Sequence, residues 1–397
     1  MNSNSSSSIT QITMWWPSVV IVLLLQISNL VVSQSIINTL PGFTGELPFK
    51  LETGYIGVGE LDEVQLFYYF IESERSPKDD PLVLWLTGGP GCSGFSTLFY
   101  EMGPLSFNYA NSSGNKPTLE LNPYSWTKVA NIIFLDSPVG TGFSYATTWE
   151  AYNVNDTLLA AQIYEFLRKW LLAHSMFLSN PLYIGGESYS GIPVPIIAQE
   201  VLNGNEIGNL PPLILKGFVL GNPLTHRIYD VAARLKFAHR MALISDRLYE
   251  NNQYLYSYIW ANDKTVREAL HIREGTITNW ERCNTSLAYT MNVITSIDYH
   301  RNLTKKDIRA LVYSGDHDMA FPYVSTEEWI ETLDLSIKDD WRPWFVGGQI
   351  AGYVTIFAEE KYSLTFTTIK GGGHTTPEYK PKECLAMIDR WFSYYFL

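Results

Sequence analysis

The chain has 397 residues, of which 46% are apolar and 17% are charged. This composition excludes a disordered chain and provides enough apolar side chains for a large core. Acidic residues outnumber basic ones by 40 to 28, and the resulting charge of −12 argues against a nucleic-acid partner, since an acidic surface repels phosphates. With only three cysteines, the chain is not a small disulfide-stabilised scaffold. The composition favours a large globular enzyme.

A secretory signal peptide is predicted over residues 1–33. Met14–Leu25 is almost entirely apolar, and Val31 and Ser33 are small enough for a cleavage site. An uncleaved membrane anchor over Met14–Val32 is the alternative, but this segment is barely long enough to span a bilayer. We therefore expect a protein of the secretory pathway, secreted or vacuolar, with no membrane attachment after cleavage.

Short apolar runs alternate with longer helical patterns along the rest of the chain, which predicts a sheet with crossover helices. The expected strands are Val64–Glu72, Pro81–Leu86, Asn131–Asp136, Pro181–Gly185, Leu213–Leu220, Arg309–Tyr313 and Leu364–Ile369. The expected helices are Asp156–Ala173, Pro193–Asn203, Ser325–Leu333 and Lys382–Phe396. The third begins with a capping-box pattern at Ser325–Glu328. Because no repeat or Pro-rich linker interrupts residues 34–397, we interpret them as one α/β domain whose strands are covered on both faces.

The sharpest chemical signal is the hexapeptide Gly186-Glu-Ser-Tyr-Ser-Gly191. It lies between a predicted strand and a predicted helix, which is the context of a nucleophile elbow, where small flanking residues let the chain turn sharply at a serine. Gly186 and Ser190 flank Ser188, so the last position departs from the strict G-x-S-x-G form. An ordinary strand-to-helix turn is the alternative. The context favours Ser188 as a nucleophile.

A serine nucleophile needs a base and an acid that orients the base. Asp316 and Asp318 follow the sixth predicted strand and are both candidates for the acid, while His374 follows three glycines after the last predicted strand. The run Asp316-His317-Asp318 also resembles a metal cluster, but no paired Cys or His spacing supports it, and no metal is expected. The glycine-rich run Thr87–Gly94 is a candidate oxyanion loop, because glycine lets the backbone approach a carbonyl closely.

Together, these segments resemble the serine carboxypeptidase-like family of α/β-hydrolases over nearly all of the chain after the signal. The resemblance is carried by Leu40–Phe43, Leu51–Tyr55, Leu84–Ser93, Asp136–Tyr145, Gly186–Tyr189, Gly315–Asp318 and Gly372–His374. It implies an α/β-hydrolase fold, a mixed and mostly parallel central sheet flanked by helices. It also implies that Ser188 is the nucleophile, Asp318 the acid and His374 the base. The N–H groups of Gly89 and Tyr189 would be the oxyanion donors, and no cofactor is expected.

The substrate-binding residues that the resemblance implies differ from those of the family's peptidases at one position. Carboxypeptidases of the family bind the terminal carboxylate of a peptide through an Asn before two glycines and through two glutamates. Glu101 and Glu187 match the glutamates and Gly88 the first glycine, but Thr87 occupies the Asn position, as in the plant acyltransferase branch. Thr lacks amide donors, which favours transfer of an acyl group from a glucose ester to an alcohol. Carboxypeptidase activity on peptides and a catalytically silent member are the alternatives.

The resemblance also implies a shortened lid and one disulfide. Family members usually carry a lid of several dozen residues where this chain has only a short stretch, around residues 247–259. The remaining family disulfide matches Cys92 with Cys283 and leaves Cys384 unpaired. Sequons for N-glycosylation, which agree with secretion, occur at Asn111, Asn155, Asn284 and Asn302.

Overall fold

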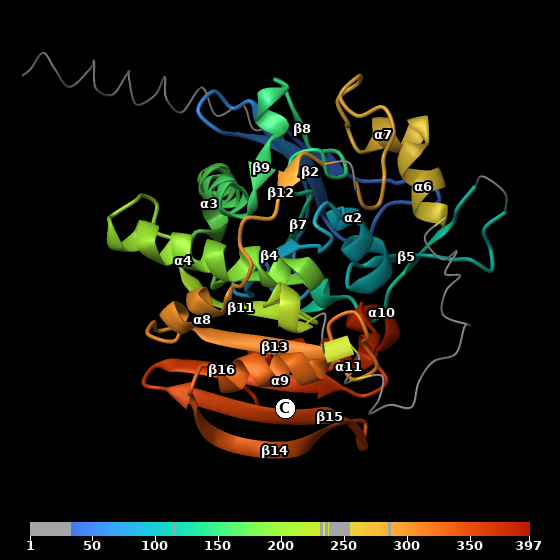
Figure 1. The fold of residues 1–397 in the computed structure, drawn as a ribbon. Coiled ribbons are helices and arrows are strands. Elements are labelled where there is room, and N and C mark those ends of the chain that lie inside the picture. Colours follow the sequence, from blue (N-terminus) through green and yellow to red (C-terminus); the bar gives the residue numbers. More distant parts are fainter. Residues whose placement is uncertain (1–32, 114–115, 231–232, 235–236, 238–254, 285–286) are drawn as a thin grey trace, which may run out of the picture.

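The computed structural model describes residues 33–397 except 114–115, 231–232, 235–236, 238–254 and 285–286 (Figure 1). Within these residues, twelve strands form one mixed sheet in the order β1-β2-β3-β7-β4-β10-β11-β13-β16-β15-β14, with β8 also paired to β3. Neighbouring strands from β7 to β16 are parallel. Antiparallel strands flank this parallel centre on both sides. In Figure 1, β13 to β16 form the lower end of the sheet, in orange and red.

The strands of the sheet are β1 (Ser33–Ile37), β2 (Leu51–Val58), β3 (Val64–Ile71), β4 (Leu82–Leu86), β7 (Asn131–Leu135), β8 (Tyr145–Ala146), β10 (Leu182–Glu187), β11 (Leu215–Gly221), β13 (Arg309–Gly315), β14 (Ser336–Val346), β15 (Gln349–Glu359) and β16 (Tyr362–Ile369). Two small ribbons pair β5 (Leu105–Phe107) with β6 (Leu119–Leu121) and β9 (Val154–Asn155) with β12 (Tyr289–Thr290). The helices are α2 (Gly94–Ser96), α3 (Asp156–Ala173), α4 (Pro193–Glu206), α6 (Leu255–Asn262), α7 (Lys264–Ala269), α8 (Ile297–Leu303), α9 (Tyr323–Glu331), α10 (Thr376–Tyr379) and α11 (Pro381–Phe392).

The sheet lies between two apolar cores, because successive residues of a strand point to opposite faces. On β4, Leu82, Leu84 and Leu86 belong to one core, whereas Val83 and Trp85 belong to the other. Residues of α3, α4, α8 and α9 complete the first core, and residues of α2, α6, α7 and α11 complete the second. Helices on both faces explain why this strand is apolar throughout.

Most of the expected elements are present. Each expected strand is found with ends shifted by one or two residues, and the helix expected over Asp156–Ala173 is α3 with the same bounds. The capping box expected at Ser325 is wrong, because α9 begins two residues earlier, directly after Pro322. The hydroxyl of Ser325 instead donates to the carbonyl of Pro322 within the first turn, at 2.9 Å. Strands β1, β2, β14 and β15 were not expected.

Parts of two sequence predictions fall outside the described residues. The predicted signal occupies residues 1–33, of which only Ser33 is described, as the first residue of β1 paired with Tyr55. Of the segment 247–259, residues 255–259 belong to α6 and the rest is not described. No helix in the described ranges is long and apolar enough to cross a bilayer.

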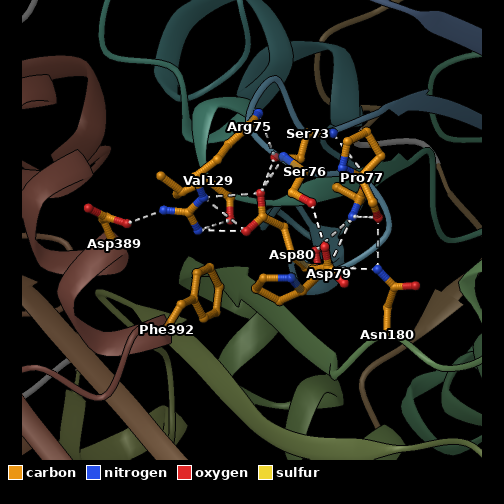
Figure 2. Close-up of polar contacts among 12 residues, drawn as sticks. Ser73, Arg75, Ser76, Pro77, Asp79, Asp80, Val129, Asn180, Asp389 and Phe392 are labelled. Atoms are coloured by element: carbon orange, nitrogen blue, oxygen red, sulfur yellow. Dashed lines mark hydrogen bonds and ion pairs between the residues drawn. The ribbon is translucent and has the colours of Figure 1, made fainter.

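A polar network ties the start of β4 to α11 (Figure 2). One carboxylate oxygen of Asp80 accepts from Arg75 Nη2 at 2.6 Å, and the other accepts from Ser73 Oγ at 2.6 Å. The backbone N–H of Ser76 donates to Asp80 as well, at 3.0 Å. Arg75 continues the network to Asp389 of α11, at 3.1 Å. The network lies at the amino ends of the parallel strands.

Replacing Asp80 by Asn should lower the free energy of unfolding by about 1–3 kcal/mol, because buried donors lose a charged acceptor. Urea unfolding followed by circular dichroism measures this loss. An unchanged midpoint would show that the network contributes nothing to stability.

Candidate active site

Ser188 lies at the carboxyl end of β10, where the chain turns sharply into α4. Its backbone has φ of +57°, a region that non-glycine residues rarely adopt. Two glycines make room for this turn, since a Cβ on Gly186 would lie 2.6 Å from the Cβ of Ser190. A Cβ on Gly88 would lie 2.5 Å from the Cβ of Ser188. The turn leaves Ser188 partly exposed although the residues on both sides of it are buried.

His374 lies between Ser188 and Asp318. Its Nε2 is 2.9 Å from Ser188 Oγ, and its Nδ1 is 2.8 Å from Asp318 Oδ2. A carboxylate only accepts, so it assigns the proton of the neutral ring to Nδ1 and leaves Nε2 free to accept from the serine hydroxyl. This arrangement can remove a proton from Ser188 as its oxygen attacks a substrate.

Asp318 is buried, and several donors hold its carboxylate ionised. The backbone N–H of Ala320 donates at 2.7 Å and that of Phe321 at 3.2 Å. Burial acts to raise the pKa of Asp318, but the charge of His374 and hydrogen bonds from His374, Ala320 and Asn222 outweigh it and lower the pKa. In turn, burial acts to lower the pKa of His374, but the charge of Asp318 outweighs it and raises the pKa. The two charges therefore stabilise each other once His374 has taken up a proton.

Asp316, the other candidate acid, does not contact the ring of His374. Its Oδ1 accepts from the N–H of Gly371 at 2.6 Å, at the start of the loop that carries His374. The structure thus places Asp318 against the ring of His374, and Asp316 against the loop that carries this ring. Among the described residues, no group of three or more His, Cys, Asp or Glu side chains is arranged to hold a metal ion.

Asn222 belongs to this site but was missed by the sequence analysis. Its Nδ2 donates to Asp318 Oδ2 at 2.8 Å, and its Oδ1 accepts from Thr376 Oγ1 at 2.6 Å and from the N–H of Gly315 at 3.2 Å. It therefore joins Asp318 to the segment that follows His374. Its position two residues after the expected strand Leu213–Leu220, at the same ends of the parallel strands as Ser188, was the available signal.

The two N–H groups predicted to bind an oxyanion belong to loops on either side of Ser188. Gly89 follows β4 with φ of +107°, and Tyr189 begins the turn after Ser188. The hydroxyl of Tyr189 donates to the buried carboxylate of Asp156 and accepts from Arg227 Nη2 at 2.7 Å. The hydroxyl of Tyr289 donates to the same carboxylate at 2.7 Å. This buried cluster, which fixes the side chain of Tyr189, was also missed.

The predicted substrate-binding side chains lie next to this centre. Glu101 and Glu187 are only 2% and 4% exposed. Burial raises the pKa of both carboxyls, and the charge of Glu187 raises that of Glu101 further. Such a pair favours holding a proton, so it can donate a hydrogen bond to a ligand. The hydroxyl of Thr87 lies 2.9 Å from that of Thr97, so it has a partner within the protein.

The structure contains the expected disulfide between Cys92 and Cys283, whose Cα atoms are 3.9 Å apart. Cys384 is free and buried in α11. Ser93 N–H donates to the carbonyl of Arg282 at 2.8 Å, so the disulfide and a backbone hydrogen bond fasten the candidate oxyanion loop to the same segment.

The four predicted glycosylation sites have different surroundings. Asn111 and Asn302 are exposed. Asn155 is half-buried, and its side-chain oxygen caps α3 by accepting from the N–H of Leu158 at 2.9 Å. Asn284 is half-buried, and its Nδ2 donates to the carbonyl of Gly140 at 2.9 Å. Modification of all four remains a prediction.

A fluorophosphonate should label the Asp318→Asn variant more slowly than wild type. Because Asp318 raises the pKa of His374, the fall of the labelling rate at acid pH should also move to lower pH in this variant. Loss of this acid should cost about 10⁴-fold in rate. The matched variant Asp316→Asn should keep most of the wild-type labelling rate, and this rate should fall over the same acid pH range as in wild type. The labelling rate as a function of pH tests both, and a greater loss in Asp316→Asn would reverse the assignment.

Comparison with known proteins places the chain in a family. The profile described as serine carboxypeptidase matches residues 41–257 and 252–394. Serine carboxypeptidase-like 17 of Arabidopsis thaliana is 46% identical, covering 94% of this chain and 96% of that protein. Serine carboxypeptidase-like 1 of the same plant is 48% identical, covering 91% and 93%. The alignment to the former spans 422 positions, more than the 397 residues here, so that relative has residues without a counterpart in this chain.

A solved structure agrees with the fold. Kex1(Δ)p, a prohormone-processing carboxypeptidase from Saccharomyces cerevisiae, has a TM-score of 0.76 at 19% identity and covers 90% of this chain and 95% of its own. The α/β-hydrolase fold expected from the sequence is confirmed, with its parallel central strands and helices on both faces. By its profile match and its identity to relatives along most of its length, the chain belongs to the serine carboxypeptidase family.

Proposed function

We propose that the protein is an acyltransferase that moves an acyl group from a glucose ester to an acceptor alcohol through an acyl-Ser188 intermediate. The observation that carries the proposal is the hydrogen-bonded chain from Ser188 through His374 to Asp318, with distances of 2.9 and 2.8 Å. Such a chain activates a serine hydroxyl for attack on an ester or amide carbonyl.

In the proposed first step, Ser188 Oγ attacks the ester carbonyl while His374 Nε2 takes its proton. The N–H groups of Gly89 and Tyr189 stabilise the negative oxygen of the tetrahedral intermediate. Asp318 stabilises the imidazolium, which then gives its proton to the departing glucose oxygen. In the second step, His374 removes a proton from the acceptor alcohol, whose oxygen attacks the acyl carbonyl. As the bond between the acyl group and Ser188 Oγ breaks, the imidazolium gives that proton to Oγ and restores the serine hydroxyl.

Thr87 supports transfer over peptide hydrolysis. Its hydroxyl is paired with that of Thr97, and Thr has no amide donor for the terminal carboxylate of a peptide. A serine carboxypeptidase activity is the second candidate, and the glutamate pair favours it. With burial raising the pKa of both carboxyls, Glu101 and Glu187 can hold a proton for a bound carboxylate. The substrates are accordingly a small acyl ester with an alcohol, or a peptide.

A catalytically silent member is the third candidate, motivated by the shortened lid. The family profile matches in two parts that meet at residues 252–257, close to the predicted shortening. Against silence, the serine, histidine and aspartate keep hydrogen-bonding distances that a silent protein has no need to retain. We also propose, from the predicted signal and sequons, that the enzyme is a glycoprotein acting in the secretory pathway, either secreted or vacuolar.

Incubation of the purified protein with acyl-glucose esters plus alcohols, and separately with blocked dipeptides, distinguishes the three candidates by product analysis. We expect acyl-alcohol products, and Ser188→Ala should lose about 10⁶-fold in turnover. Release of C-terminal residues without ester formation would favour the peptidase. No product from either set, together with no labelling by a fluorophosphonate, would favour the silent member.

Thr87→Asn should raise kcat/KM for blocked dipeptides by roughly 10–100-fold, because it supplies a hydrogen bond to a charged carboxylate. Thr87→Ser is the matched control, since it keeps a hydroxyl and adds no amide. Both variants are compared with wild type on peptides and on acyl-glucose esters. Equal peptide kinetics in the Asn and Ser variants would remove Thr87 as a determinant of specificity.

A further inference from the structure

Asp136 is a fully buried acid that the proposed reaction does not use. It comes directly after β7, next to the loop that follows β4 in the neighbouring strand. Its Oδ1 accepts from Ser93 Oγ at 2.6 Å and from the N–H of Gly94 at 2.9 Å. Its Oδ2 accepts from the N–H of Phe143 at 2.8 Å. One carboxylate therefore joins two loops at the carboxyl edge of the sheet.

The surroundings of Asp136 are shaped for a carboxylate. Three donors point at it from two loops, and a carboxylate has acceptor sites for all of them. The second loop approaches so closely that a Cβ on Gly142 would lie 2.0 Å from Asp136 Oδ2. The hydroxyl of Ser93 also accepts from the N–H of Phe95 at 3.1 Å, so its proton is directed to Asp136. An amide in place of the carboxylate would set an NH₂ group against one of these donors.

The loop that Asp136 holds is the one that carries Gly89. It runs from the end of β4 to Ser93 and closes on itself through the hydrogen bond from Cys92 N–H to the carbonyl of Gly88, at 3.2 Å. The disulfide and the backbone hydrogen bond to Arg282 fasten this loop to a segment outside the sheet. Asp136 instead fastens it to the end of β7, inside the parallel centre. The loop that carries Gly89 is therefore held at two places, by a segment outside the sheet and by the end of β7.

We propose that Asp136 is a positioning residue, which holds the Gly88–Ser93 loop so that the Gly89 N–H points at the oxyanion formed on Ser188. This inference rests on the proposed function, because it takes that N–H as an oxyanion donor. The carboxylate acts through Ser93 and Gly94 and does not touch the substrate.

The ionised form of Asp136 is the form that accepts all three hydrogen bonds. Burial raises its pKa to about 7, although the hydrogen bonds from Ser93, Phe143 and Gly94 lower it. The titratable side chains that face it in the described part of the chain are Tyr69 of β3 and Tyr55 of β2, and burial raises the pKa of both phenols, so they stay neutral. Because the folded pKa lies above the unfolded value of 3.8, the unfolded state loses this proton first, and stability falls as pH rises from 3.8 to about 7. Above that pH the folded protein holds, at the site that fixes the loop, a charge that burial disfavours.

Fluorophosphonate labelling tests this positioning role without knowledge of the natural substrate. The reagent forms a bond between Ser188 Oγ and phosphorus with loss of fluoride, and its phosphoryl oxygen occupies the oxyanion site. Rates are compared per folded protein, with the folded fraction taken from urea unfolding. Asp136→Asn should label about 10²-fold more slowly, as expected when one oxyanion donor is lost. Asp80→Asn, which removes another buried carboxylate at the opposite edge of the sheet, should label at the wild-type rate.

The pH profile separates positioning from a merely structural role. In wild type, protonation of His374 and of Asp136 both slow labelling as pH falls, so the acid limb should be steeper than a single ionisation. In Asp136→Asn, the fall of the labelling rate at acid pH should follow a single ionisation, that of His374. Ser93→Ala keeps the carboxylate but removes one donor, so it should give a smaller loss of the same kind and covers the case in which Asp136→Asn does not fold.

Wild-type rates in Asp136→Asn and Ser93→Ala, or losses that follow only the folded fraction, would overturn the inference. An acid limb of equal steepness in wild type and Asp136→Asn would overturn it as well. If wild type itself is not labelled at Ser188, the proposed function fails first. If wild type is labelled and Asp136→Asn is labelled at the same rate per folded protein, only the positioning role fails.

Discussion

The turn at Ser188 is the constraint around which the site is arranged. A serine at φ of +57° costs on the order of 1–3 kcal/mol, which the packing of β10 and α4 must offset. The turn also demands close approach of other chain segments. A Cβ on Gly88 would meet the Cβ of Ser188 at 2.5 Å, and a Cβ on Gly191 would lie 2.4 Å from the carbonyl oxygen of Leu224. Glycine is therefore required at these positions because a side chain there would overlap neighbouring segments of the chain.

Asp318 and Asp136 are both buried at the carboxyl ends of the parallel strands, but their pKa values are shifted in opposite directions. Their surroundings explain the difference. Asp318 faces His374, whose positive form attracts its charge, so its pKa falls although burial opposes this. Asp136 receives hydrogen bonds from neutral groups only, and burial raises its pKa to about 7. The first aspartate is therefore suited to stabilising an imidazolium, while the second is suited to holding loops together near neutral pH.

The sequence predicted the parts of the molecule that local patterns determine. Apolar runs located the parallel strands because helices cover both faces, and the strand-to-helix context of Ser188 located the elbow. The hairpin of β14 and β15 was missed because much of β14 is exposed, so its residues form no continuous apolar run. The start of α9 was misplaced because Ser325 fits a cap by sequence, whereas Pro322 ends the preceding extended segment.

Side chains that act through another residue were harder to find. Asn222 and Asp136 gain their roles only when separate loops meet at one sheet edge, and Asp156 gains its role when Tyr189 and Tyr289 reach the start of α3. A sequence motif identifies a candidate nucleophile through the residues next to it in the chain. It does not show which distant carboxylate holds the loop beside it.

Transfer through one acyl-Ser188 intermediate can be tested by the way this intermediate divides between the acceptor alcohol and water. Two donors would carry the same acyl group, one on glucose and one on p-nitrophenol, with the acceptor alcohol at a fixed concentration. A common intermediate has lost its leaving group, so both donors should give the same ratio of acyl-alcohol to free acid. A ratio that depends on the donor would rule out a common acyl-Ser188 intermediate, because the acceptor would then be reacting before the leaving group has departed.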